Sequence, residues 1–320
     1  MRLTVIDQTA PELEDLAERS PQATFYHTRV WAKSLSRVFP WIAYRSIIAE
    51  EEGEVLGYLP FFIVGKGARR ALWSLPFGTY GGPVTLDSNE VHLALLDHYA
   101  GLRRSMKVYE TGWVDFWNRP AVQPFKTESA ITHIIDLEPG FDKIWSESFD
   151  KSKRKHTKQA ERRGVRVVET NSVEDAGRFH HIYASRITAA GGRVHYPKEF
   201  FEELLGEGTN RVKLFLAYHE DELLGGQLNF YFKDTVIAWY GVTTIESRAL
   251  QASTSLYTHC IRHACDNGYK RFNLGGSMGK DSLMEYKMSF GGVPHRYAVS
   301  TIRSTIGKIA AAIKRIRTDR

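Results

Sequence analysis

The chain has 320 residues, of which 42% are hydrophobic and 25% charged, a composition typical of a soluble globular protein. No stretch approaches 18 uninterrupted apolar residues, so no transmembrane helix is predicted. The formal net charge of +6 favours an anionic partner such as RNA, a phosphorylated substrate or an anionic membrane face. The length suits two domains.

The N-terminal sequence and the cysteines both indicate a cytoplasmic protein. Residues 1–20 have no apolar signal core and become acidic at Glu12, so we expect no export. Cys260 and Cys265 lie within one predicted helix, at a spacing that does not suit a disulfide. We therefore expect reduced thiols.

Strands and helices alternate through the first half of the chain. The patterns predict strands over 3–6, 44–49, 55–64, 71–76, 107–116 and 131–137, and helices over 11–19, 28–38 and 89–106. The loop Ser74–Val84, SLPFGTYGGPV, is rich in glycine and aromatic residues. Such loops often approach ligands, so we expect Tyr80 to contact substrate.

The pattern restarts after Glu138-Pro139-Gly140. It predicts helices over 152–163, 173–190, 197–205 and 253–267, and strands over 165–169, 212–218, 222–232 and 235–242. Both halves thus combine helices with an antiparallel meander. We predict an α+β fold of two similar domains, 1–139 and 140–301, each with a mostly antiparallel central sheet flanked by helices.

The stretch FNLGGSMGKDSLMEYKMSFGG, residues 272–292, contains the strongest local signals. It predicts a strand over 270–274 that breaks at Gly275-Gly276, then a helix with a capping box of Ser282 and Glu285. The helix would end at Gly291-Gly292.

Two interpretations of this helix are open. Tyr286 and Phe290 lie four residues apart on one face, with Lys287 about a quarter-turn away. A lysine beside a polar turn could hold an anionic or carbonyl-bearing substrate. Alternatively, Glu285 only caps the helix, both aromatic rings belong to the core, and Lys287 is solvated.

The order of elements resembles tandem GNAT-type acyltransferase domains. The amino-acid sequences of three stretches are similar to those of the Fem family of peptidoglycan-bridge aminoacyltransferases and their relatives with a BioF2-like acetyltransferase domain. These stretches are SKRKHTKQAERRGVRV at 152–167, GGQLNFYF with AWYG at 225–241, and the final stretch 272–292.

The resemblance implies transfer of an amino acid from aminoacyl-tRNA to an amine of a cell-wall precursor, with no permanently bound cofactor. It makes Tyr286-Lys287 the functional pair, in which a lysine ammonium would stabilise the developing oxyanion. The remaining expected site residues are Gly275, Gly276 and Ser277, which would shape the site, Tyr240, which would line it, and Arg154 and Arg248, which would contact phosphates.

The donor has an alternative. Fem enzymes carry a long helical hairpin, and no segment of this chain is long enough for one. An N-acyltransferase using acyl-CoA on an amino sugar or polysaccharide precursor is therefore the second hypothesis. The coenzyme A motif R/Q-x-x-G-x-G/A would fall within Ser247–Leu256, where Gln251 and Ser253 replace the glycines. Hydroxyls at 253–255, with Arg248, could bind phosphate or only cap a helix.

Three other features leave alternatives. His259 and His263 lie one turn apart with Cys260 nearby, but no third ligand is evident and no metal site is predicted. The basic helix 151–163 could bind RNA or lipid-linked phosphates, or be a solvated face.

The last residues, 302–320, predict a basic amphipathic helix that docks on the protein or lies on an anionic membrane. An enzyme peripheral to the inner membrane face would fit the second arrangement. A non-catalytic RNA- or membrane-binding module is the third hypothesis for the chain as a whole.

Overall fold

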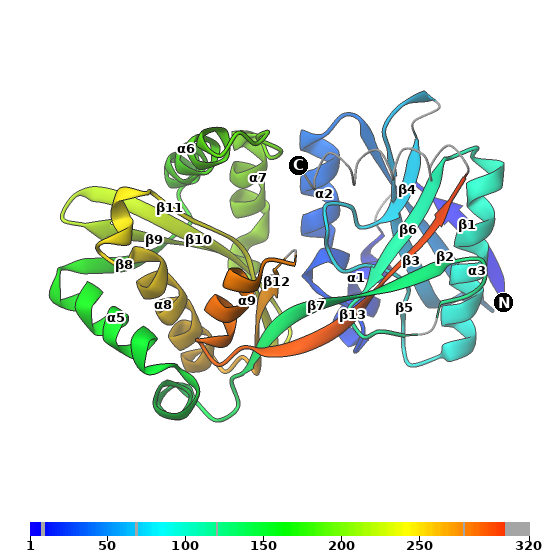
Figure 1. The fold of residues 1–320 in the computed structure, drawn as a ribbon. Coiled ribbons are helices and arrows are strands. Elements are labelled where there is room, and N and C mark those ends of the chain that lie inside the picture. Colours follow the sequence, from blue (N-terminus) through cyan, green and yellow to red (C-terminus); the bar gives the residue numbers. More distant parts are fainter. Residues whose placement is uncertain (8–9, 68–69, 120, 278, 305–320) are drawn as a thin grey trace. The chain divides into compact units, whose positions relative to one another are not determined.

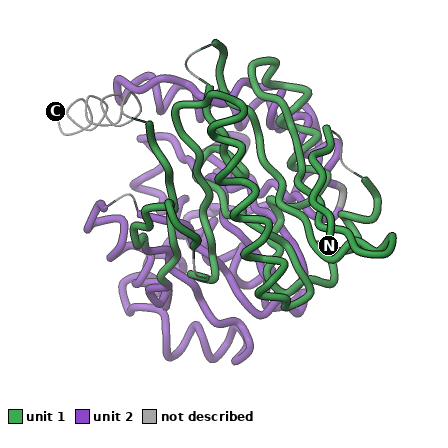
Figure 2. The backbone as a smooth tube through the Cα atoms, turned by 90° about the vertical axis from the view of Figure 1, so that its right-hand side faces the viewer, with its two compact units in different colours: residues 1–130, 296–320 green, residues 131–295 purple. Residues whose placement is uncertain are grey.

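The computed structural model describes residues 1–7, 10–67, 70–119, 121–277 and 279–304. The chain forms two compact units (Figure 2). Unit 1 consists of residues 1–130 together with the C-terminal segment from residue 296, and unit 2 consists of residues 131–295. Each unit is described by itself below.

Unit 1 has one sheet in the order β1-β2-β3-β4-β6-β13, in which only β4 and β6 pair in parallel. Its elements are β1 (Arg2–Ile6), α1 (Pro11–Arg19), η1 (Phe25–His27), α2 (Arg29–Val38), β2 (Ile42–Glu51), β3 (Glu54–Val64), β4 (Ala71–Ser74), β5 (Val84–Thr85), α3 (Asn89–Ser105), β6 (Glu110–Asp115) and the end of β13 (Val293–Arg303).

The period-2 pattern of β3 gives this sheet two buried faces. Leu59 and Phe61 pack in one cluster with Leu95 and Tyr99 of α3. Tyr58 directly precedes Leu59 and so belongs to the opposite face, where its hydroxyl donates to the backbone oxygen of His27 in η1. The core of unit 1 therefore lies on both sides of its sheet.

Unit 2 has a sheet in the order β8-β9-β10-β11-β12-β7, in which only β11 and β12 pair in parallel. Its elements are the end of β7 (Lys126–Asp136), α4 (Phe141–Lys143), η3 (Ile144–Ser148), α5 (Lys151–Arg162), β8 (Val165–Thr170), α6 (Val173–Ala189), α7 (Lys198–Gly208), η4 (Thr209–Arg211), β9 (Val212–His219), β10 (Glu222–Phe232), β11 (Thr235–Thr243), η5 (Glu246–Arg248), α8 (Ala252–Asp266), β12 (Arg271–Gly276) and α9 (Asp281–Met288).

Helices cover both faces of the unit 2 sheet. α6 and α7 lie on one face, and α5, α8 and α9 lie on the other (Figure 1). Strand β10 shows the alternation: a side chain at Gly226 would meet Phe179 of α6, whereas the Tyr231 hydroxyl bonds His263 of α8 at 3.2 Å. The site described below lies where this sheet opens.

The predicted α+β class with mostly antiparallel sheets is confirmed. The predicted boundaries 1–139 and 140–301 differ from the observed division, because unit 2 already begins at residue 131 and the segment from residue 296 belongs to unit 1. β7 follows unit 1 in sequence, yet it pairs with β12 of unit 2. β13 follows unit 2, yet its residues 298–303 pair with β6 of unit 1. Unit 1 is therefore built from two separate segments of the chain, whereas unit 2 is contiguous.

Three local predictions also need correction. Ile302 and Arg303 belong to β13 rather than to a helix, and the rest of the predicted tail helix, 305–320, lies outside the described residues. β12 continues through Gly275-Gly276, with φ +77° at Gly275. No capping box forms at α9, because the helix already starts at Asp281 and Ser282 falls inside its first turn.

Candidate active site

A β-bulge at Trp239 opens the unit 2 sheet. Leu228 of β10 pairs with Tyr240, but the next residue, Asn229, pairs with Ala238, so Trp239 is an extra residue in β11. Such an insertion shifts the alternation of the strand. Trp239 and Tyr240 consequently both face α6 and α7, since their rings contact Phe201 and Tyr183, respectively.

The parallel pairing of β11 and β12 ends two residues before this bulge, at Ile237 and Asn273. Beyond that pair, residues 240–243 of β11 line a pocket of about 360 Å³, and none of the described residues that line it comes from β12 or is Lys287. A volume of this size is suited to a small ligand or part of a larger one. The pocket is lined by Tyr183, Arg186, Ile187, Gly226, Gln227, Tyr240, Gly241, Val242, Thr243, Ser253, Leu256, Tyr257, Leu283 and Tyr286.

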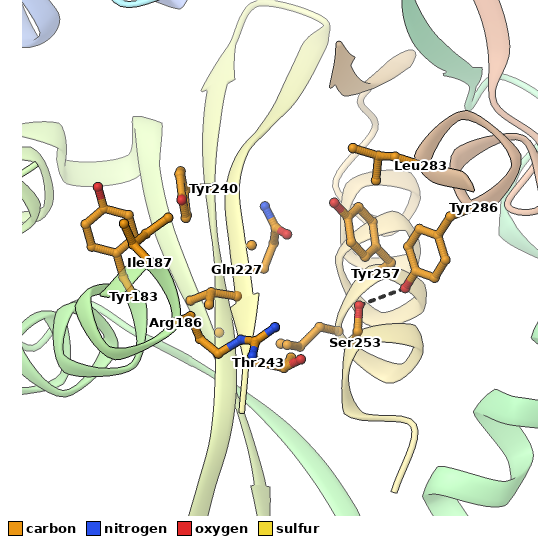
Figure 3. A pocket seen from close by; sticks show the side chains of 14 residues that line it. Tyr183, Arg186, Ile187, Gln227, Tyr240, Thr243, Ser253, Tyr257, Leu283 and Tyr286 are labelled. Carbon is orange, nitrogen blue, oxygen red and sulfur yellow. Dashed lines mark hydrogen bonds between the residues drawn. The ribbon is translucent and has the colours of Figure 1, made fainter. Parts of the chain in front are cut away.

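Strands β10 and β11 run through the middle of the pocket and divide its lining residues into two groups (Figure 3). Tyr183 and Tyr240 lie on the α6 side, with their rings 4.9 Å apart. Ser253 and Tyr257 of α8 and Tyr286 of α9 lie on the other side, and Gln227 points from β10 toward them. We refer to these two parts as the α6 side and the α8 side.

Lys287 belongs to α9 and is buried against the end of β12, with 4% of its surface exposed. Its Nζ donates to the backbone oxygens of Gly275 and Gly276, each at 2.7 Å. Burial lowers the pKa of this lysine to about 8. The interpretation of Lys287 as a solvated side chain is therefore wrong, and the structure brings it together with the predicted glycine turn.

The glycine turn places this ammonium near the strand opening. An atom added at Cβ of Gly275 would lie 3.9 Å from Lys287 Nζ and 3.8 Å from the backbone oxygen of Ala238, just before the bulge. The turn itself is braced by Asn273, whose Oδ1 accepts from the N–H of Gly275 at 2.9 Å and from the hydroxyl of Thr132 at 2.6 Å.

Two further buried polar groups lie in this region. Ser277 is 3% exposed, and its Oγ has no hydrogen-bond partner among the described residues. His133 on β7 is 1% exposed, and burial, together with the charge of Lys287, lowers its pKa. His133 is therefore neutral at physiological pH, and Lys287 carries the charge here.

Tyr286 connects α9 to the start of α8. Its hydroxyl and the Ser253 hydroxyl lie 2.8 Å apart (Figure 3), and Lys153 Nζ lies 3.9 Å from the centre of its ring. Burial raises the pKa of Tyr286, so the phenol keeps its proton and can donate it. Phe290 is fully buried, in agreement with its predicted place in the core.

The start of α8 has an unusual cap. Gln251 occupies the N-cap position with φ +59°, and no side chain caps the helix. The first amide groups of a helix have no intrahelical partner and attract anions. The guanidinium of Arg163, at the end of the basic helix α5, contacts the backbone oxygen of Ala249, and Arg248 is exposed. Basic side chains therefore border this helix end.

Arg154 does not reach the pocket. Its Nη1 donates to the backbone oxygens of Trp145, Ser146 and Phe149, at 3.1, 2.8 and 2.6 Å. These carbonyls belong to η3 and to the residue that follows it, so Arg154 stabilises the turn before α5. The predicted phosphate contact of Arg154 has no support in this geometry.

Tyr80 is also packed rather than open. It is 6% exposed in unit 1, and its ring lies 4.9 Å from Phe116, 5.4 Å from Tyr297 and 6.0 Å from Tyr26. The aromatic residues of its loop build core rather than a binding surface. The predicted contact of Tyr80 with substrate is therefore replaced by a structural role.

The histidine pair has ordinary partners. His263 Nε2 lies 3.2 Å from Glu169, and its Nδ1 lies 3.2 Å from the Tyr231 hydroxyl. The described residues contain no group of three or more His, Cys, Asp or Glu side chains that could hold a metal ion. Both cysteines, Cys260 and Cys265, are free thiols.

Tyr183, Arg186, Gln227 and Tyr257 are among the pocket residues that sequence reasoning missed. One signal was available for Gln227, which interrupts the otherwise apolar run LLGGQLNFYF of a central strand. A polar side chain in such a strand needs a partner or a function. The three helical residues carried no comparable signal.

Residues 147–288 match the family model of the Acetyltransferase (GNAT) domain. Unit 2 contains a GNAT acetyltransferase domain. The predicted acyltransferase class is thereby confirmed, and the match spans α5, the meander, α8 and α9. The pocket of this GNAT domain is the candidate active site.

Solved structures share the tandem fold at low sequence identity. FemX has a TM-score of 0.70 at 15% identity, over 92% of this chain and 96% of that one. The C-terminal domain of a protein assigned as a lysylphosphatidylglycerol synthetase, from Agrobacterium fabrum, has a TM-score of 0.63 at 11% identity. The match covers 94% of this chain and 93% of that one. A tandem GNAT protein from the clavulanic acid biosynthesis pathway has a TM-score of 0.57 at 11% identity, over 94% of this chain and 98% of that one.

Among curated proteins, no sequence matches this chain. None of the helices in the described part of the chain has the length and apolar character needed to cross a bilayer. Structural likeness shows the fold, and the family-model match concerns residues 147–288.

Proposed function

We propose that this GNAT domain is a Fem-type N-aminoacyltransferase. It would transfer an amino acid from aminoacyl-tRNA to an amine of a cell-wall precursor, with the reaction at the opening between β11 and β12. The observation that carries the proposal is the buried ammonium of Lys287 at this opening, bonded to Gly275 and Gly276. The likeness of the fold to FemX supports the same class.

The reaction is an aminolysis. The acceptor nitrogen forms a bond to the ester carbonyl carbon, the bond from that carbon to the tRNA ribose oxygen breaks, and one proton passes from the amine to the leaving oxygen. Lys287 would stabilise the negative oxygen that develops on the carbonyl. The Tyr286 hydroxyl, which keeps its proton because of burial, would donate to the leaving oxygen.

The basic surface beside the pocket supports a phosphate-bearing donor. The uncapped start of α8 and the neighbouring Arg248 and Arg163 offer amides and guanidinium groups to phosphate. The exposed lysines and arginines of α5 extend this surface. Such a surface would hold the end of a tRNA, with its aminoacyl group in the pocket.

Acyl-CoA is the second candidate donor, because the matched family model is that of an acetyltransferase domain. Coenzyme A also carries phosphates, which would use the same helix end. The two donors differ in the transferred group and in the length of their carrier.

The experiment presents both donors to the purified protein, with lysine-containing peptidoglycan precursors as acceptors. Alanyl-tRNA labelled in the amino acid reports aminoacyl transfer, and acetyl-CoA reports release of free thiol. We expect transfer from alanyl-tRNA that is lost in Lys287→Met and kept in Lys270→Met, which removes an exposed lysine of the same unit. Transfer from acetyl-CoA alone would replace the first candidate by the second.

A further inference from the structure

Gln227 is a buried amide with an unused acceptor. It is 1% exposed, and its Nε2 donates to the backbone oxygen of Leu228 at 3.3 Å. This bond fixes the orientation of the amide, because the opposite orientation would place two oxygens together. Oε1 has no hydrogen-bond partner among the described residues, although Gln227 lines the pocket.

The residue opposite Gln227 leaves space for this amide. Gly241 pairs with Gln227 across β10 and β11, and an atom added at its Cβ would lie 2.1 Å from Oε1. The backbone of Gly241 is not in the left-handed region, so the position does not need glycine for its conformation. Glycine here serves to admit the Gln227 side chain beside the pocket.

A buried acceptor without a donor is costly to the folded state, so a ligand with a matching N–H would restore the lost hydrogen bond. Gln227 points to the α8 side of the pocket (Figure 3). Ser253 and Tyr286, beside the proposed phosphate site, belong to the same side. The transferred group of the donor, rather than the acceptor, is therefore the nearest source of an N–H.

We propose that Gln227 accepts a hydrogen bond from the α-amino group of the aminoacyl donor and so selects aminoacyl over plain acyl groups. This inference rests on the proposed function. The α-amino group has N–H bonds in both its neutral and its charged form, and the rings of Tyr257 and Tyr286 on the same side favour the charged form. Leu256 and Leu283 line the pocket where a small aliphatic side chain would fit.

The test uses two donors that differ only in the α-amino group: the L-alanyl and propionyl thioesters of pantetheine. The wild-type protein should prefer the alanyl donor by about 10- to 100-fold in kcat/KM. Gln227→Met removes the acceptor at similar volume and should reduce the preference to about 3-fold or less. Gly241→Ala should do the same, since its methyl group displaces Oε1. Leu228→Met, a buried substitution on the opposite face of β10, should keep the preference.

A binding measurement separates this inference from the proposed function. L-alaninamide and propionamide are titrated against the same variants by NMR. Stronger binding of alaninamide that depends on Gln227, without transfer from alanyl-tRNA or from either thioester, would support the role of Gln227 and refute the transfer. Equal binding of the two amides, or a preference that survives Gln227→Met, would overturn the inference whatever the transfer assay shows.

Discussion

The two units contain the same parallel strand pair and use it differently. In unit 1, β4 and β6 remain paired up to Ser74 and Trp113. In unit 2, the pairing of β11 and β12 ends at Ile237, and the bulge at Trp239 opens the sheet. The β11 residues that follow the bulge, 240–243, line the pocket of unit 2.

The surroundings of the glycines near the two strand pairs show how tightly each pair is packed. An atom added at Cβ of Gly82 in unit 1 would lie 2.6 Å from the Trp113 ring, and one at Gly112 would lie 2.6 Å from the Trp73 ring. In unit 2, the nearest atoms to the same position at Gly275 are 3.8 and 3.9 Å away. Tryptophan rings therefore close one strand pair, while a bulge opens the other. One topology can thus serve as scaffold or as active site.

The largest expected effect is the loss of activity in Lys287→Met. Removing one oxyanion-stabilising group typically costs about 10²- to 10³-fold in kcat. We expect a loss of this size in alanyl transfer, with the fold intact by circular dichroism. Lys270→Met is the matched control. A Lys287→Met protein with near wild-type kcat would place the chemistry elsewhere.

Gly82→Ala and Gly275→Ala compare the packing at the two strand pairs through their effects on the free energy of unfolding. Both glycines have positive φ, at +98° and +77°, so both substitutions carry backbone strain. Only Gly82→Ala adds a clash with a buried tryptophan ring, which should lower the free energy of unfolding by a further ~1–3 kcal/mol. Denaturant unfolding of both variants measures the difference. Equal destabilisation would mean that unit 1 is not closed by Trp113.

Tyr286→Phe should lower kcat about 10-fold, because the leaving oxygen loses a charge-assisted hydrogen bond of about 1.5 kcal/mol. Ser253→Ala should lower kcat less, and the double variant should resemble Tyr286→Phe, since the two hydroxyls share one hydrogen bond. Tyr269→Phe, in the same unit but outside the pocket, is the control. Additive losses would show that the hydroxyls act separately.

The last effect concerns pH. The pKa of Lys287 is lowered to about 8, so between pH 8 and about 10.5 the unfolded chain binds more protons at this residue than the folded chain. Stability should therefore rise with pH across that window, relative to Lys287→Met. Unfolding curves at pH 7.5 and 9.5 test this. An identical pH dependence in the two proteins would contradict a desolvated Lys287.

Much of this fold could be predicted from sequence, because its strands and helices follow local periodicity. The three strands of the second meander and helices α1 and α6 lie close to their predicted ranges. The pairing of β7 with β12 and of β13 with β6 could not be predicted, since the pairing of strands far apart in sequence leaves no local pattern. A bulge such as Trp239 is invisible for the same reason, and with it the pocket.

The site was predicted in part. Lys287, Gly275 and Gly276 do come together, but helical period alone could not decide whether Lys287 is buried. Arg154 and Tyr80 were chosen for charge and loop composition, which do not show where a side chain points. Gln227 was overlooked because its meaning depends on Gly241 in the neighbouring strand.

One measurement tests most directly whether the opened strand pair is the active site: hydrogen exchange with and without a non-reactive aminoacyl-tRNA mimic, in which an amide replaces the 3′ ester. The account predicts slower exchange in residues 237–243, 252–257 and 279–287, and unchanged exchange in residues 74–84 of unit 1. Protection confined to residues 74–84 would contradict it.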